Sequence, residues 1–182
     1  MFKYIWVDIL IMLVFVVGIH NKTKRDLVSE FFKLIGVLCA TFIALHFYKR
    51  LAHIWSGVSV LGEYSDFLAF SILSGSVIGF FYLVRRGWFD ILKIDLNSII
   101  DRLGGFIFSI VKSYFVGGLI FFSFLLSGHQ ILSTAAKKSL SYRLFKKTSI
   151  NIYHVVYSGF IVNFFPKEPL NRSAYKLLKD LE

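Results

Sequence analysis

The chain has 182 residues, of which 56% are hydrophobic, and its formal net charge is +10. A water-soluble domain of this size could not cover so much apolar surface with polar groups, so the composition excludes a soluble globular protein and indicates an integral membrane protein. The single cysteine, Cys39, excludes an intramolecular disulfide and a cysteine-based metal cluster.

Four apolar segments are predicted to be transmembrane helices, the first and third at the short end of the usual range. They are residues 4–19, 31–48, 67–84 and 104–127. The first is interrupted by Asp8 and no small-residue cleavage site follows it, so we interpret it as a retained span rather than a signal peptide. The predicted fold class is an all-α integral membrane protein with four transmembrane helices.

Three further segments are considered for the membrane surface. Apolar residues recur at three- and four-residue steps through 88–103, which predicts an amphipathic helix between spans three and four, or else an extension of the fourth span. A basic, weakly amphipathic stretch follows the fourth span. Residues 150–165 are apolar, but at about 24 Å they are short for a span, so we expect an interfacial or bundle-packed helix, with a fifth span as the alternative.

The predicted domains are a transmembrane domain at 1–128 and a basic C-terminal tail at 129–182. Counting Lys33, the first and third connections hold eight Lys and Arg residues, against three in the N-terminus and second connection. The positive-inside rule therefore predicts an external N-terminus. Counting the basic residues that closely follow the fourth span makes the two sides equal, so the side of the tail stays open.

Small residues recur at every fourth position in three of the predicted spans. Because lipid tails are as apolar as leucine, helices in a bilayer associate where small residues let their backbones approach closely. These stripes predict a tightly packed helix bundle, formed within one chain or between protomers. They are Gly36, Ala40 and Ala44 in the second span, Ser71, Gly75 and Gly79 in the third, and Gly105, Ser109, Ser113 and Gly117 in the fourth.

Four charged residues, Asp8, Asp101, Arg102 and Lys112, are candidates for a functional role. A charge at the bilayer centre costs about 2.5–3.5 kcal/mol on insertion scales, so Lys112 in a polar cavity is one hypothesis. The other is that its side chain extends toward the cytoplasm and reaches lipid phosphates or Asp101. Asp8 is expected to be hydrated or bonded to a neighbouring helix. Its depth differs from that of Lys112 by more than about 10 Å, so the two are not expected to pair.

No catalytic or cofactor-binding motif accompanies these residues. Cys39, His46 and His53 recur at seven-residue steps, each rising about 10.5 Å along a helix, so one ion could not bind two of them. Walker A, H-E-x-x-H, G-x-S-x-G, dinucleotide-binding and nucleic-acid-binding motifs are absent from the sequence. We therefore predict no enzymatic activity, no cofactor, no metal and no nucleic-acid partner.

The sequence contains, in this order, "WVDILIML" at 6–13, "LVSEFFKLIGVLCATFIALHFY" at 27–48 and "IDRLGGFIFSIVKSYFVG" at 100–117. In these segments the chain resembles the colicin V production protein (CvpA) family of small bacterial inner-membrane proteins. The stretch "KKSLSYRLFKKTSINIY" at 137–153 is similar to the family's post-membrane segment. The first turn, "NKTKRD", differs from the Arg-Gly-Phe-like residues that are usual there.

The resemblance implies a role in colicin V production or export and in envelope maintenance, without catalytic residues. The leading hypothesis is a non-enzymatic inner-membrane protein that acts through contacts with membrane lipids and with an unidentified membrane or exported protein. An accessory subunit of a secretion complex is a variant of it. The rival is a small oligomeric channel or transporter that uses Lys112 and Asp8. A homo-oligomer is compatible with the small-residue stripes.

Overall fold

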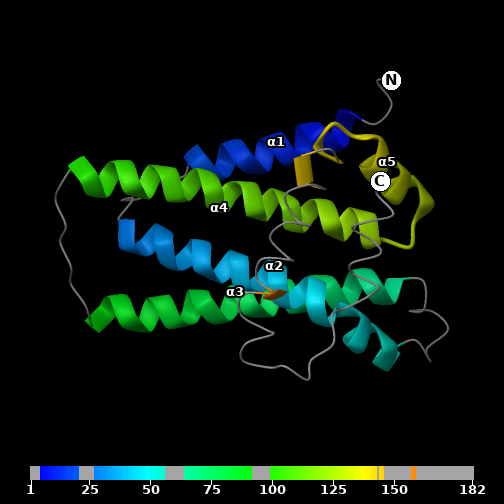
Figure 1. Cartoon of the computed structure of the whole chain (residues 1–182), viewed down its shortest axis with the longest axis horizontal. Coiled ribbons are helices and arrows are strands. Elements are labelled where there is room, and N and C mark those ends of the chain that lie inside the picture. Colours follow the sequence, from blue (N-terminus) through cyan, green and yellow to red (C-terminus); the bar gives the residue numbers. More distant parts are fainter. Residues whose placement is uncertain are drawn as a thin grey trace.

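The computed structural model describes residues 5–20, 27–55, 64–91, 99–142, 144–145 and 157–158. Within these residues the chain is helical and forms no strand, as the predicted all-α class requires. The helices are α1 (Ile5–His20), α2 (Leu27–Trp55), α3 (Ser65–Ile91), α4 (Ile99–Leu126) and α5 (Gln130–Lys138), and Figure 1 shows their arrangement.

Three of the helices are long and apolar enough to cross a membrane. These segments are Leu27–Ile54, Ser65–Gly87 and Asp101–Leu126, and they coincide with the second, third and fourth predicted spans. Helix α1 occupies the place of the first, but it has only 16 residues. Its length is therefore about 24 Å, compared with about 30 Å of hydrocarbon in a typical bilayer.

The predicted surface segments are described only in part. Residues of the expected helix at 88–103 belong to two elements, since α3 ends at Ile91 and α4 begins at Ile99, and residues 92–98 lie outside the described part. The segment 150–165 also lies outside it, apart from Tyr157 and Ser158. The ring of Tyr157 stacks on His46 of α2 with 6.3 Å between their centroids.

From top to bottom of Figure 1 the helices lie in the order α1, α4, α2, α3. Helices α2 and α4 begin at the same end, where the backbone N–H of Leu27 donates a hydrogen bond of 2.7 Å to Oδ1 of Asp101. Helices α1 and α3 run in the opposite direction. We call the end at which α2 and α4 begin the Asp101 end, and the opposite end, where α1 begins, the Asp8 end.

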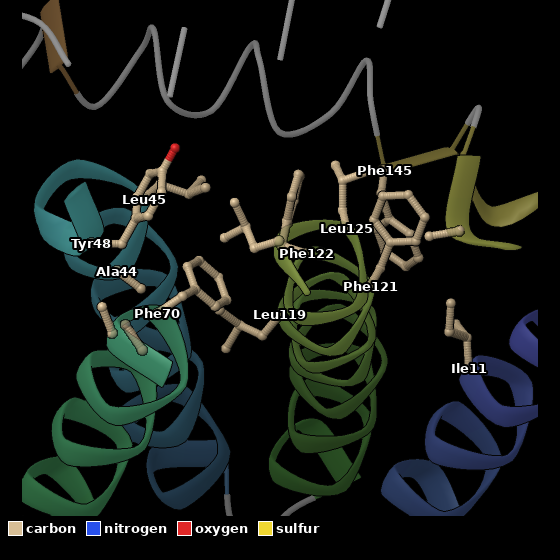
Figure 2. Packing of buried hydrophobic residues seen from close by; sticks show 14 of the residues in the cluster. Ile11, Ala44, Leu45, Tyr48, Phe70, Leu119, Phe121, Phe122, Leu125 and Phe145 are labelled. Atoms are coloured by element: carbon tan, nitrogen blue, oxygen red, sulfur yellow. The ribbon is translucent and has the colours of Figure 1, made fainter. Parts of the chain in front are cut away.

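Helix α4 is central because it buries aromatic side chains on two sides. Phe121 and Phe122 are both fully buried. Figure 2 shows Phe122 turned toward α2 and α3, where its ring lies 6.5 Å from that of Phe70, and Phe121 turned toward Phe145, at 5.4 Å. Ala135 and Ala136 of α5 belong to the same apolar cluster, so residues beyond α4 pack on the helices before them.

The three small-residue stripes face different neighbours. All four stripe residues of α4 are buried, and the Ser109 hydroxyl donates to the Gly18 carbonyl of α1 at 3.2 Å. In α2, a β-carbon added at Gly36 would lie 2.8 Å from Cβ of Phe81 in α3. Gly75 and Gly79 of α3 differ, since no described heavy atom lies within 4 Å of an added β-carbon at either. The stripes of α4 and α2 thus join helices within the chain, whereas Gly75 and Gly79 of the α3 stripe meet no described neighbour.

We predict opposite effects of one methyl group at two glycines of the α2–α3 pair. Gly36→Ala should lower the free energy of unfolding by about 1–3 kcal/mol, because the methyl overlaps the β-carbon of Phe81. The control Gly79→Ala has room and should be neutral or stabilising by up to about 1 kcal/mol, since alanine is the better helix former. Unfolding of the purified protein in mixed detergent micelles measures both values. Equal destabilisation would show that the α3 stripe is packed as closely as Gly36.

Candidate functional site

Charged side chains of α2 and α4 meet near the Asp101 end. Glu30, in the first turn of α2, is 4% exposed. Its Oε1 accepts a hydrogen bond from Nζ of Lys33 at 2.5 Å, and its Oε2 accepts one from Nζ of Lys112 at 2.6 Å. We call Glu30, Lys33 and Lys112 the Glu30 cluster. It holds one carboxylate between two ammonium groups.

The direction of helical side chains explains how Lys112 reaches Glu30. Side chains tilt toward the N-terminus of their helix, which for α4 is the Asp101 end. The ring of Phe31 lies 5.4 Å from that of Phe108, so Glu30 lies about one helical turn nearer that end than the backbone of Lys112. The side chain of Lys112 is long enough to span this distance. Glu30 was not among the partners expected from the sequence, which were lipid phosphates and Asp101.

Burial makes the two charges depend on each other. The side chain of Lys112 is 16% exposed and that of Glu30 is 6% exposed. Removing a charge from water is costly, and only a well-placed opposite charge with good hydrogen bonds compensates for it. The contact therefore fixes how α2 and α4 lie against each other, because a shift of either helix would leave Lys112 buried without its counter-charge and Glu30 with Lys33 alone.

Two more polar contacts hold the helix ends around the cluster. Asp101 is 5% exposed, and its bond from the Leu27 N–H satisfies one of the free donors at the start of α2. Nη1 of Arg85, near the end of α3, donates to the Ser29 hydroxyl at 2.7 Å. Asp101 is therefore a cap for a neighbouring helix, whereas the adjacent Arg102 is exposed.

At the opposite end, Asp8 binds the residues that follow α5. Its Oδ1 accepts from the backbone N–H and the hydroxyl of Ser141, at 2.9 and 2.6 Å, and its Oδ2 accepts from the Leu140 N–H at 3.1 Å. We call residues 139–142 and 144–145 the fold-back segment. The carboxylate accepts from two backbone donors there, so Asp8 joins the start of α1 to the fold-back segment.

The fold-back segment turns toward the middle of α4. Phe145 is 4% exposed, and a β-carbon added at Gly118 would lie 3.2 Å from its ring. Gly118 precedes the last residue of α4 by eight positions, which corresponds to about 12 Å along the helix. Tyr142 packs edge-on against Phe121, and burial raises the pKa of its hydroxyl, which stays neutral. Part of the basic stretch expected at the membrane surface is thus packed against the transmembrane helices.

A sequence profile of the colicin V production protein family matches residues 7–150. The chain belongs to this family. The match contains Asp8, the Glu30 cluster and the fold-back segment, and it confirms the resemblance found in the sequence. No curated protein and no solved structure matched the chain.

In this colicin V production family protein, the two charges within the predicted spans have separate partners. The Lys112 ammonium lies against Glu30 near the Asp101 end. Asp8 lies about one helical turn before Ile11 in α1. A β-carbon added at Gly117 would lie 3.4 Å from Ile11, and Gly117 is in the half of α4 nearer the Asp8 end. The two charges therefore do not form a pair, as their expected depths require.

The described residues contain no group of three or more His, Cys, Asp or Glu side chains that could hold a metal ion. His46, one of the three residues at seven-residue steps, is 3% exposed and stacks on Phe42 with 5.5 Å between ring centroids. In the Glu30 cluster, the carboxylate of Glu30 in α2 offsets the charge of Lys112 in α4.

Glu30 is the residue that sequence reasoning missed. The second predicted span begins at residue 31, so Glu30 falls just outside it and receives no role in the sequence analysis. Helix α2 begins four residues earlier, at Leu27. The signal that could have found it is the i, i+3 pair of Glu30 and Lys33 at the start of an apolar helix, a spacing that places both on one face.

We predict that neutralising one member of the buried pair is worse than neutralising both. Glu30→Gln should lower the free energy of unfolding by about 3–5 kcal/mol, because it leaves Lys112 buried without its counter-charge. Glu30→Gln with Lys112→Met should recover most of that loss. The control Lys49→Met breaks an exposed bridge to Asp66 and should cost at most about 1 kcal/mol. Unfolding in mixed micelles tests this, and a double variant as unstable as Glu30→Gln would contradict it.

Proposed function

We propose that this protein is a non-enzymatic, multi-pass protein of the bacterial inner membrane that supports colicin V production or export, or envelope maintenance, through contacts with proteins and lipids. Membership of the colicin V production family supports the link to the toxin. The observation that carries the non-enzymatic proposal is the pairing of Lys112 with Glu30. The charge in the apolar part of α4 joins two helices instead of acting on a substrate.

We infer that α1 crosses the membrane together with the three longer helices. Two contacts join α1 to α4. The Ser109 hydroxyl donates to the Gly18 carbonyl, and the ring of Trp6 lies edge-on to that of Phe124 with 6.0 Å between their centroids. These contacts cover fifteen positions of α4, or about 22 Å, which is most of the hydrocarbon thickness. The Asp101 end then faces the cytoplasm, where the positive-inside rule favours exposed residues such as Arg86 and Arg102.

A channel or transporter that uses Lys112 and Asp8 is the second candidate, and the contacts favour it less. A charge that serves a conduction path lines a water-filled cavity. Here Lys112 bonds to a buried carboxylate, and both oxygens of Asp8 accept bonds from the fold-back segment. The two residues also lie toward opposite ends of the bundle.

Complementation of a toxin-producing strain that lacks this gene tests the proposal. We expect the Glu30→Gln variant to accumulate less in the membrane. Toxin secretion, and detergent resistance as the measure of envelope maintenance, should fall in the same proportion. Glu30→Gln with Lys112→Met should restore both to at least half of the wild-type values, because the buried charges are removed together. A double variant that accumulates normally without supporting either activity would overturn the proposal and favour transport through Lys112.

Thiol labelling in intact cells tests the orientation. In a Cys39→Ser background, single cysteines replace Lys137 of α5 or Arg86 of α3, both of which are exposed. With four spans and an external N-terminus, a membrane-impermeant reagent should label Lys137→Cys in intact cells and Arg86→Cys only after lysis. The reverse pattern would invert the orientation, and labelling of both in intact cells would exclude the four-span arrangement.

A further inference from the structure

The Glu30 cluster carries more positive than negative charge. Glu30 is its one carboxylate, and Lys33 and Lys112 both donate to it, so the three side chains sum to a charge of +1. The partial positive charge at the start of α2 is offset by Asp101, which accepts a bond from the Leu27 N–H, so the excess belongs to the cluster itself. An excess charge next to apolar surroundings is costly unless an anion compensates for it.

Lys33 is the member of the cluster that can meet such an anion. Its side chain is 36% exposed, compared with 6% for Glu30 and 16% for Lys112. A lysine ammonium has three donors, and one of them bonds to Glu30. Lys33 is six residues beyond Leu27, about 9 Å from the start of α2, a depth from which a lysine side chain extends to the lipid headgroups.

The helical spacing shows which surface of α2 carries Lys33. Residues three and four positions away are its neighbours on that surface. Glu30, three before it, bonds to Lys112 of α4, whereas Ser29, four before it, bonds to Arg85 of α3. Lys33 therefore lies on the face of α2 between α3 and α4, between the residues that bind Arg85 of α3 and Lys112 of α4.

We propose that the Glu30 cluster binds the phosphate of an anionic phospholipid in the leaflet at the Asp101 end, with Lys33 as the contacting residue. The lipid is the source of the phosphate because Lys33 belongs to a membrane-spanning helix, where lipid headgroups are the nearest anions outside the chain. The inference rests on the proposed function, in which the protein acts partly through lipid contacts. It makes the cluster a lipid site as well as a link between helices.

Native mass spectrometry of the purified full chain tests the site, with phosphatidylglycerol and phosphatidylcholine as probes. The wild-type protein should bind phosphatidylglycerol in preference. Lys33→Gln should lower that affinity about fivefold, as expected for one lysine at an anionic surface, and Lys33→Arg should retain it. The matched control is Lys49→Gln, which removes a paired lysine from the other end of the same helix and should leave the preference unchanged.

Three results would overturn the site. Lys33→Gln could bind phosphatidylglycerol as the wild type does, or Lys49→Gln could lose as much affinity as Lys33→Gln. Millimolar inorganic phosphate could also displace the lipid fully, which would show a site for free phosphate. Because the assay uses purified protein, its failure leaves the complementation result standing, and a failed complementation with intact lipid binding would overturn only the proposed function.

Discussion

The ion pair between Glu30 and Lys112 is the contact on which the arrangement of the helices depends. Burying Lys112 without a counter-charge is costly, so α2 and α4 are held side by side at the depth where its ammonium meets Glu30. The pair also sets the rotation of α4. Successive residues of a helix are about 100° apart, so when Lys112 faces α2, Ser113 faces α1, where it lies against Gly18.

Much of the helical framework follows from local properties of the sequence. Long apolar segments identify the transmembrane helices because a span must satisfy its backbone within itself. The stripe of Ser109 and Ser113 correctly indicates a face at which backbones come close. The depth argument also separates Asp8 from Lys112, since it needs only the rise per residue and the bilayer thickness.

Contacts between distant segments are not encoded in such local patterns. The stripe of Gly75 and Gly79 looks the same in the sequence as that of Gly36, yet only Gly36 meets a neighbouring described helix. The partner of Lys112 was missed because Glu30 stands at the boundary of an apolar segment. The basic stretch after α4 has the pattern of a surface helix, and nothing near Phe145 in the sequence reveals that its ring meets Phe121.

The bond between Asp8 and Ser141 joins residues 133 positions apart, which has a consequence for biogenesis. During synthesis, α1 is made first, but the fold-back segment, which binds the Asp8 carboxylate, is made only after α2, α3 and α4. Helix α4, on which α1 packs, is the last of these three to be made. Helix α1 is therefore made long before the residues that bond to its acidic side chain, and the contacts between the two ends of the fold form only after the ribosome has passed the fold-back segment.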